Sequence, residues 1–370
     1  MKIAIDGTFL TQNNNAGPEN YVKNLVESMF LVDSTSEYII YTSEDNVLSI
    51  PPEMQGSKKV TLKKVGNGLF GTQAKIALSV LTDKPNVLFC PFHKAPMLLL
   101  PLGIKPTLMI HGLEYASNNL SFFQKLIPET QLKILAKYSN NIIVPSRYVN
   151  EKLQILYKVD KTKIKIVPEG VSKKFFSQAS QEEIESVRNQ YSIKNKYILA
   201  VSTIQPRKNY NRLILAFSNL CRDPDFTMSL VICGKYGWGA EDTLSLPEKL
   251  GIKDRVIFTG RVDDSYIAPL YQGSTITANV SLEEGFGLPL LEAMASKKPL
   301  VISNLKPYKD LAQENAVYVN PHDAESIEQG LKTALQEYDH SKLENACNIA
   351  LGMSWERSAT EILTILKSNY

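Results

Sequence analysis

The sequence of 370 residues is poor in the side chains that build disulfides and metal sites. It has four cysteines without a C-x-x-C pair, and four histidines that show no metal-ligand spacing. Cys90 and Cys233 end apolar runs that are typical of strands, so we expect buried free thiols. This use of cysteine indicates a reducing compartment, and we expect a cytoplasmic protein without a bound metal or cofactor.

Long apolar runs are also missing. The longest, residues 95–104, is far shorter than the roughly 20 residues that cross a bilayer. Asp6 interrupts the N-terminal stretch in which a signal peptide would need a continuous apolar region. We therefore expect neither an exported protein nor an integral membrane protein. No P-loop or serine-nucleophile motif is present.

Acidic residues are scarce in one part of the chain. The net charge is only +3, but residues 51–165 contain 17 Lys and Arg against 6 Asp and Glu. One interpretation is a solvated basic surface. The other is a surface that approaches anionic lipids at the inner face of the membrane, or a phosphate-bearing acceptor. No nucleic-acid-binding motif accompanies the basic residues, so we do not expect nucleic acid as a partner.

Strand-like apolar runs alternate with amphipathic segments, which predicts an α/β protein with parallel sheets. The runs form two sets, separated by the polar stretch 172–196, in which we expect a linker and a helix. We place the strands at 2–6, 37–42, 86–90, 106–110, 141–145 and 164–168, and then at 196–202, 227–233, 255–260, 274–280, 299–303 and 316–320. The prediction is two Rossmann-like doubly wound domains, residues 1–175 and 176–354, facing a central cleft, with a closing helix at 355–370.

The most informative segment is SLEEGFGLPLLEAMASKKPLVIS, residues 281–303. It predicts a strand, then a loop with Gly285 and Gly287, then a helix that opens near Leu288. The glycines let the backbone approach a ligand closely, because no Cβ intervenes. The N–H groups and positive dipole of the helix start form an anion site that suits a diphosphate.

Two carboxylates flank this helix start. Glu284 lies in the loop, and Glu292 lies about one turn into the helix. Both can point at one ligand, because carboxylates accept hydrogen bonds from sugar and ribose hydroxyls. The alternative for Glu292 is an ordinary acid near a helix N-terminus.

A second segment, ILAVSTIQPRKNYNRLILAF at residues 198–217, predicts a strand, a loop, and a helix that Arg207 and Lys208 enter. Two cations at a helix N-terminus oppose its dipole and are destabilising unless an anion binds beside them. A diphosphate would be that anion, and the cations would then stabilise charge developing on a leaving group. The alternative is a solvated pair in a loop.

His111 follows the apolar run PTLMI at residues 106–110, a position at the mouth of a parallel sheet. A lone histidine is commonly structural, but the end of a buried strand favours a place in a ligand site. Asp223-Pro224-Asp225 matches the D-x-D metal motif, but it follows a helix and not a strand, so we expect a turn.

The segment EEGFGLPLLEAMA resembles the E-x7-E signature of retaining glycosyltransferases of the GT-B fold in the GT4 family (glycosyl transferases group 1), of the kind found in bacterial mannosyltransferases. The resemblance implies that Glu292 binds the donor ribose and that Glu284 lies beside the transferred sugar. It also implies that main-chain groups of four residues contact the sugar and phosphate: Gly285, Phe286, Gly287 and Leu288. In this family Arg207 and Lys208 would bind the phosphates, and His111 would contact the sugar.

Further segments resemble the family in the expected order. Gly17 stands in the first loop, which approaches the donor phosphates and the acceptor, and main-chain groups near Val262 would bind the base. KIKIVPEGVSKKFF resembles an interdomain V-P-N-G-V stretch, with Glu169 in place of the usual Asn. SWERSATEIL resembles the closing helix that crosses back to the first domain. The resemblance gives the first domain the acceptor side and the second domain the donor side.

The activity that the resemblance implies is metal-independent transfer of a hexose, with retention, from a nucleotide-sugar to a glycan or lipid-diphosphate-linked acceptor in bacterial surface polysaccharide (lipopolysaccharide) synthesis. GDP-mannose is the first expectation for the donor, and a UDP-hexose is the second. Arg207, Lys208, His111 and Glu284 would be the catalytic set. Two other classes stay open: a GT-B nucleotide-sugar epimerase or phosphorylase, and a non-catalytic sugar-binding protein.

Overall fold

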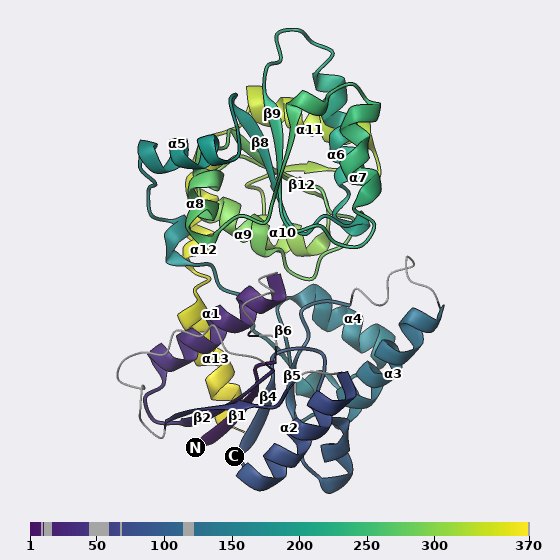
Figure 1. Cartoon of the computed structure of the whole chain (residues 1–370), viewed down its shortest axis with the longest axis vertical. Coiled ribbons are helices and arrows are strands. Elements are labelled where there is room, and N and C mark those ends of the chain that lie inside the picture. The colour runs from purple at the N-terminus through teal and green to yellow at the C-terminus, as the bar shows by residue number, and fades with distance from the viewer. Residues whose placement is uncertain (9, 11–16, 44–58, 67–68, 114–121, 369–370) are drawn as a thin grey trace. The chain divides into compact units, whose positions relative to one another are not determined.

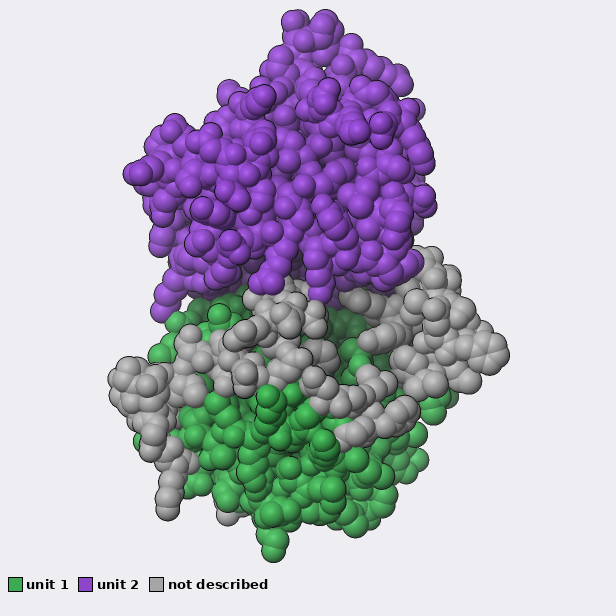
Figure 2. Space-filling view, in the orientation of Figure 1, with its two compact units in different colours: residues 1–170, 354–370 green, residues 171–353 purple. Residues whose placement is uncertain are grey.

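The computed structural model describes residues 1–8, 10, 17–43, 59–66, 69–113 and 122–368. It consists of two compact units, which Figures 1 and 2 show. Unit 1 contains residues 1–170 and 354–370, and unit 2 contains residues 171–353. Each unit is built on one parallel sheet with helices packed against it.

The sheet of unit 1 has seven strands in the order β3-β2-β1-β4-β5-β6-β7. All of its pairings are parallel, and the order reverses direction between β1 and β4. Six of the strands coincide with predicted apolar runs. The strands are β1 (Lys2–Asp6), β2 (Glu37–Thr42), β3 (Val60–Lys64), β4 (Val87–Cys90), β5 (Thr107–Met109), β6 (Ile142–Val144) and β7 (Ile164–Ile166).

Strand β3 was not predicted, and its position explains why. It forms one edge of the sheet, and its side chains are exposed or half-buried. An edge strand needs no continuous apolar run, because solvent covers much of it. Its sequence, VTLKK, therefore carries almost no strand signal.

Helices cover the sheet of unit 1. They are α1 (Gly17–Val32), α2 (Leu69–Asp83), α3 (Phe122–Tyr138), α4 (Arg147–Tyr157) and α13 (Trp355–Lys367), with 3-10 turns η2 (Met97–Leu102) and η4 (Lys161–Lys163). The last helix, α13, packs against the first, α1 (Figure 1). The rings of Tyr21 and Trp355 meet edge to face at 5.2 Å, and Lys367 pairs with Asp33 at 3.2 Å.

The sheet of unit 2 has six parallel strands in the order β10-β9-β8-β11-β12-β13. Its direction reverses between β8 and β11, which makes the carboxyl ends of these two strands the switch point of a doubly wound sheet. All six strands coincide with predicted runs. They are β8 (Tyr197–Val201), β9 (Ser229–Cys233), β10 (Val256–Gly260), β11 (Ile276–Asn279), β12 (Leu300–Ser303) and β13 (Val317–Val319).

The helices of unit 2 include one in the polar stretch before β8, as predicted. This helix, α5, begins with a capping box between Ser180 and Glu183. The helices are α5 (Gln181–Gln190), α6 (Tyr210–Leu220), α7 (Glu241–Lys249), α8 (Asp264–Gly273), α9 (Leu288–Ala295), α10 (Lys306–Ala312), α11 (Ala324–Gln336) and α12 (Ser341–Leu351), with 3-10 turns η5 (Lys173–Phe175), η6 (Pro206–Lys208) and η7 (Lys253–Arg255).

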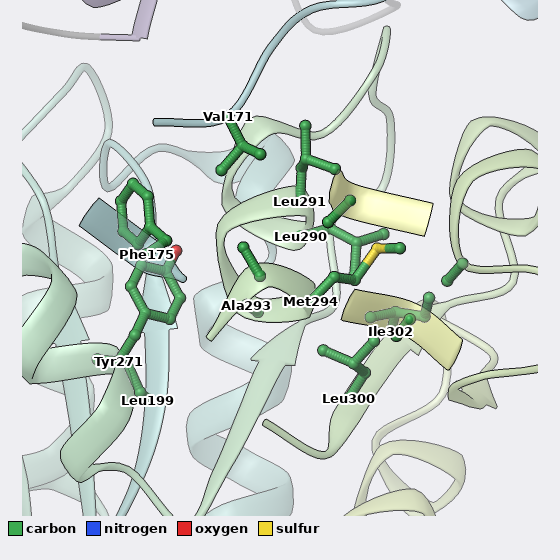
Figure 3. Close-up of a cluster of buried hydrophobic side chains, with 14 of the residues drawn as sticks. Val171, Phe175, Leu199, Tyr271, Leu290, Leu291, Ala293, Met294, Leu300 and Ile302 are labelled. Atoms are coloured by element: carbon green, nitrogen blue, oxygen red, sulfur yellow. The ribbon is translucent and has the colours of Figure 1, made fainter. Parts of the chain in front are cut away.

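A buried apolar cluster fixes helix α9 against the sheet. Leu290, Leu291 and Met294 of α9 belong to the same cluster as Leu300 and Ile302 of β12, and Figure 3 shows them together. Removing one such buried leucine to alanine typically costs about 2–5 kcal/mol. This packing therefore fixes the position of α9, including its first turn.

The predicted α/β class with two doubly wound parallel sheets is confirmed. The four cysteines are free, and three of them are buried: Cys90, Cys233 and Cys347. Asp223-Pro224-Asp225 forms the predicted turn, closed by the N–H of Asp225 bonding to the Asp223 carboxylate at 3.0 Å. Within the described ranges, no helix combines the length and the apolar character that crossing a bilayer requires.

Candidate active site

The switch point of unit 2 brings Arg207, Lys208 and Glu284 together. The two cations follow β8, and the carboxylate follows its neighbour β11. Lys208 Nζ lies 2.5 Å from Glu284 Oε1, and Arg207 Nη1 lies 3.4 Å from Oε2. All three side chains are largely buried, with 9% of Lys208 and 10% of Glu284 exposed.

A left-handed asparagine shapes the loop that carries the cations. Asn209 has φ of +63°, and its side-chain amide donates to the carbonyls of Val280 and Pro321 at 2.9 and 2.6 Å. The N–H of Leu282 donates to the carbonyl of Arg207 at 2.8 Å. These bonds join the loop after β8 to the loop after β11, so the positions of the cations and of Glu284 depend on one another.

The structure places Arg207 and Lys208 just before the predicted helix, within three residues of its start. They lie in the 3-10 turn η6, and α6 begins only at Tyr210, because Asn209 breaks the helical path. The anion beside them is also part of the protein, since Glu284 supplies it. From the sequence alone, a bound diphosphate is the expected anion at this place.

Glu284 is held as a carboxylate. Burial alone would raise its pKa, but the charges of Lys208 and Arg207 outweigh burial and lower the pKa to about 2. The hydroxyl of Ser281 donates to the same carboxylate at 2.7 Å, and that of Tyr308 donates at 3.3 Å. Sequence analysis missed Ser281 and Tyr308 as partners, because a serine and a tyrosine carry no signal of what they face.

The start of α9 offers fewer N–H groups to an anion than the sequence indicated. The helix begins at Leu288, as predicted. Pro289 has no N–H, and the N–H groups of Leu290 and Leu291 both donate to the carbonyl of Gly287. Within the first turn of the helix, the N–H of Leu288 is therefore the group that remains available to an anion. Phe286, just before it, is buried with 8% exposed.

Gly287→Ala is expected to lower the free energy of unfolding by about 1–3 kcal/mol, because φ here is +113°. In addition, a Cβ would lie 2.7 Å from Cε1 of Tyr308. Urea denaturation would measure the change. Gly251→Ala is the matched control, since Gly251 has φ of +69° but nothing within 4 Å of the added Cβ. An equal loss in both variants would show that the contact with Tyr308 has no effect.

Glu292 has a different partner from Glu284. The hydroxyl of Tyr271, on α8, donates to Glu292 Oε2 at 2.9 Å. Burial raises the pKa of Glu292 to about 7, and the bond from Tyr271 only partly opposes this rise. Val262, near which main-chain groups were predicted to bind the nucleotide base, is half-buried beyond the end of β10. It packs against the apolar cluster that contains Tyr271.

His111 lies in unit 1, just beyond β5. Its Nδ1 lies 2.9 Å from Glu169 Oε1, and its Nε2 lies 2.9 Å from the carbonyl oxygen of Pro91. Gly17 is the first residue of α1 in the same unit, and the loop before it, residues 11–16, lies outside the described residues. The other predicted site residues belong to unit 2.

In the portion of the chain that the structure describes, no three His, Cys, Asp or Glu side chains lie close enough together to hold a metal ion. The charged side chains that meet at the switch point are Arg207, Lys208 and Glu284. An Arg–Lys pair at a switch point can bind a phosphate and stabilise a leaving group.

Comparison with known proteins agrees with this chemistry. Residues 182–349 match the family model of the glycosyl transferases group 1. The O-antigen chain mannosyltransferase RfbU of Salmonella typhimurium is 28% identical over 262 residues, which cover 70% of this chain and 69% of that protein. The serotype-specific mannosyltransferase WbdA of Escherichia coli is 32% identical over 170 residues, but these cover only 20% of WbdA and 45% of this chain.

The fold agrees as well. The sucrose-phosphate synthase of Thermosynechococcus elongatus superimposes with a TM-score of 0.79 at 19% identity, covering 100% of this chain and 98% of that one. The chain is therefore a glycosyltransferase of the GT-B fold that is similar to bacterial O-antigen mannosyltransferases, and residues 182–349 of its second unit match the model of the glycosyl transferases group 1.

Proposed function

We propose that the chain transfers a hexose from a nucleoside diphosphate sugar to a glycan or lipid-diphosphate-linked acceptor in bacterial surface polysaccharide synthesis. The observation that carries this proposal is the Arg207–Lys208 pair at the switch point of unit 2, close to the start of α9. A diphosphate placed there would meet both cations and the N–H of Leu288. Glu292 would accept bonds from the ribose hydroxyls.

The transfer proceeds with retention and without a metal in this proposal. The two cations take the role that a divalent metal has in other transferases, because they stabilise the charge that develops on the leaving diphosphate. The departing phosphate then helps to remove the proton from the acceptor hydroxyl on the same face of the sugar. Glu284 lies beside the transferred sugar and also keeps the cation pair in place.

The first choice of donor is GDP-mannose, since RfbU and WbdA are named as mannosyltransferases. A UDP-hexose is the alternative. A thermal-shift panel of GDP, UDP, ADP and their sugars would separate the two, because a specific ligand stabilises the folded state by mass action. We expect GDP and GDP-mannose to raise the melting temperature most, and a larger shift with UDP would move the assignment to the alternative.

Transfer itself is tested by supplying an acceptor. Release of free nucleoside diphosphate that requires the acceptor is the expected result for a transferase. Release or rearrangement of the donor without an acceptor would instead indicate hydrolysis or epimerisation.

The lipid-linked acceptor gains support from one end of unit 1, which we call the β7 edge. It is rich in lysine and carries exposed apolar side chains, with Ile155 75% exposed. Lys163 of η4 reaches across to the carbonyl of Lys137 at the end of α3, at 2.7 Å. The β7 edge consists of Tyr138, Ile155, Leu156, Lys161, Lys163, Lys165 and Ile166.

Lysines beside exposed apolar side chains fit an anionic bilayer surface, where each cation contributes about 1 kcal/mol. We expect the protein to sediment with anionic vesicles at low salt and to be released at high salt. Ile155→Ser combined with Lys161→Glu should weaken this binding. Leu351→Ser, which removes an exposed leucine of unit 2, is the control. Equal binding to neutral and anionic vesicles would contradict the membrane contact.

A further inference from the structure

Glu169 is a buried acid at a position where the family commonly has asparagine. It directly precedes Gly170 at the end of the first segment of unit 1, and 5% of its surface is exposed. Its Oε1 lies 2.9 Å from Nδ1 of His111. A buried carboxylate is costly unless it has a partner, so the contact with His111 accounts for its place in the core.

The backbone around Glu169 is fixed by α13. The hydroxyl of Ser358 donates to the carbonyl of Pro168 at 2.7 Å. A Cβ at Gly170 would lie 2.3 Å from the backbone nitrogen of Trp355, so the chain passes this helix at a distance that only glycine allows. The backbone that carries the Glu169 side chain is therefore held in place by α13.

The ring of His111 is fixed as well. Tyr21 packs edge to face against it, with 4.3 Å between ring centroids. Its Nε2 lies 2.9 Å from the carbonyl oxygen of Pro91, which can only accept. Its Nδ1 faces the carboxylate of Glu169, and this contact is favourable only with a hydrogen between the two atoms.

We infer that Glu169 is a positioning residue that keeps a hydrogen on Nδ1 of His111. With the carbonyl of Pro91 at Nε2, both ring nitrogens are engaged by the protein, so this histidine does not act as a general base. The inference rests on the proposed sugar transfer, in which the family resemblance gives His111 a contact with the sugar. It agrees with transfer by retention, for which no basic side chain is needed.

The ring nitrogens of His111 report directly on this inference. In the full chain labelled with ¹⁵N-histidine, we expect Nδ1 of His111 to give a signal of the protonated type, with the assignment made from the spectrum of His111→Gln. In Glu169→Gln the amide can donate to Nδ1, so that nitrogen should change to the unprotonated type. An unprotonated Nδ1 in the wild-type protein would overturn the inference.

Kinetics provide the second readout. Glu169→Gln should lower kcat about 10- to 100-fold, the size of effect that follows loss of an outer partner of a functional histidine. KM for the donor and the melting temperature should change little. Glu37→Gln, which alters an exposed acid of the same unit, is the matched control. Unchanged kcat in Glu169→Gln, or an equal loss in the control, would overturn the role in catalysis.

The two failures are distinguishable. If the wild-type chain transfers no sugar, the proposed function fails, but the ¹⁵N spectra still decide the bonding of Glu169 and His111. If transfer is observed and Nδ1 is unprotonated, the inference about Glu169 fails alone.

Discussion

Lys208→Ala is expected to lower turnover by a factor on the order of 10²–10³, the usual effect of removing one group that stabilises charge in a transition state. Lys208 is the cation closest to Glu284, and in the proposed reaction its ammonium stabilises the departing diphosphate. Initial rates with saturating donor and acceptor would measure the loss. Lys208→Arg keeps the charge and should lose less.

Stability must be measured beside activity, because Lys208→Ala also leaves Glu284 buried with a weaker set of partners. Breaking a buried ion pair in this way typically costs about 3–5 kcal/mol. Rates are therefore compared at a temperature where both proteins remain folded. Lys253→Ala, which removes a lysine that is 69% exposed in the same unit, is the control. Near wild-type turnover in a folded Lys208→Ala variant would remove this residue from the mechanism.

The second large effect is a dependence of nucleotide affinity on pH that Glu292 causes. Its pKa is raised to about 7, so it is largely neutral at pH 6 and ionised at pH 8. Because the ionised carboxylate is the better acceptor for ribose hydroxyls, affinity should increase as pH rises through 7. Titration calorimetry across this range would measure the increase, and Glu292→Gln should bind weakly with little dependence on pH.

Glu292 affects the stability of the fold in the opposite direction: nucleotide affinity rises with pH, but the free energy of unfolding falls. A carboxyl whose pKa is higher in the folded state than in the unfolded state binds more protons when folded, so its contribution to stability is lost as pH rises from about 4.5 to about 7. Glu292→Gln should therefore be more stable than wild type at pH 8, by about 1–3 kcal/mol, and similar at pH 4. Glu248→Gln, which alters an exposed acid, is the control. A Glu292→Gln variant that is less stable at pH 8 would contradict the assigned pKa.

Buried parallel strands are the part of the fold that the sequence predicts best. A strand covered on both faces needs a continuous apolar run, as in TMSLVIC, which ends at Cys233. Strand β3 cannot be predicted in this way, because its edge position leaves Thr61, Lys63 and Lys64 exposed or half-buried, so they need not be apolar. Apolar content alone cannot distinguish such an edge strand from a loop.

In the candidate site, the sequence predicts the backbone features that glycine and proline determine. Gly287 and Pro289 mark the start of α9, and the structure begins that helix at Leu288. The partners of the charged groups were not predictable, because they come from other elements. Tyr271 lies on α8 and Tyr308 on α10, and each contacts a glutamate that is distant in sequence.

The contact between Glu169 and His111 shows what a departure from a family pattern can indicate. The sequence marks Glu169 as unusual but does not show what it faces. Only the parallel pairing of β5, β6 and β7 brings residue 169 close to the end of β5, where His111 lies. The signal was therefore present, but its meaning required the fold.

The claim on which the mechanism depends is that a diphosphate binds at the cation pair, beside the first turn of α9. A crystal structure of the protein with its nucleoside diphosphate tests this directly. We expect phosphate oxygens within hydrogen-bonding distance of Lys208 Nζ, the Arg207 guanidinium and the N–H of Leu288. A nucleotide bound elsewhere, with Arg207 and Lys208 still paired with Glu284, would contradict this claim.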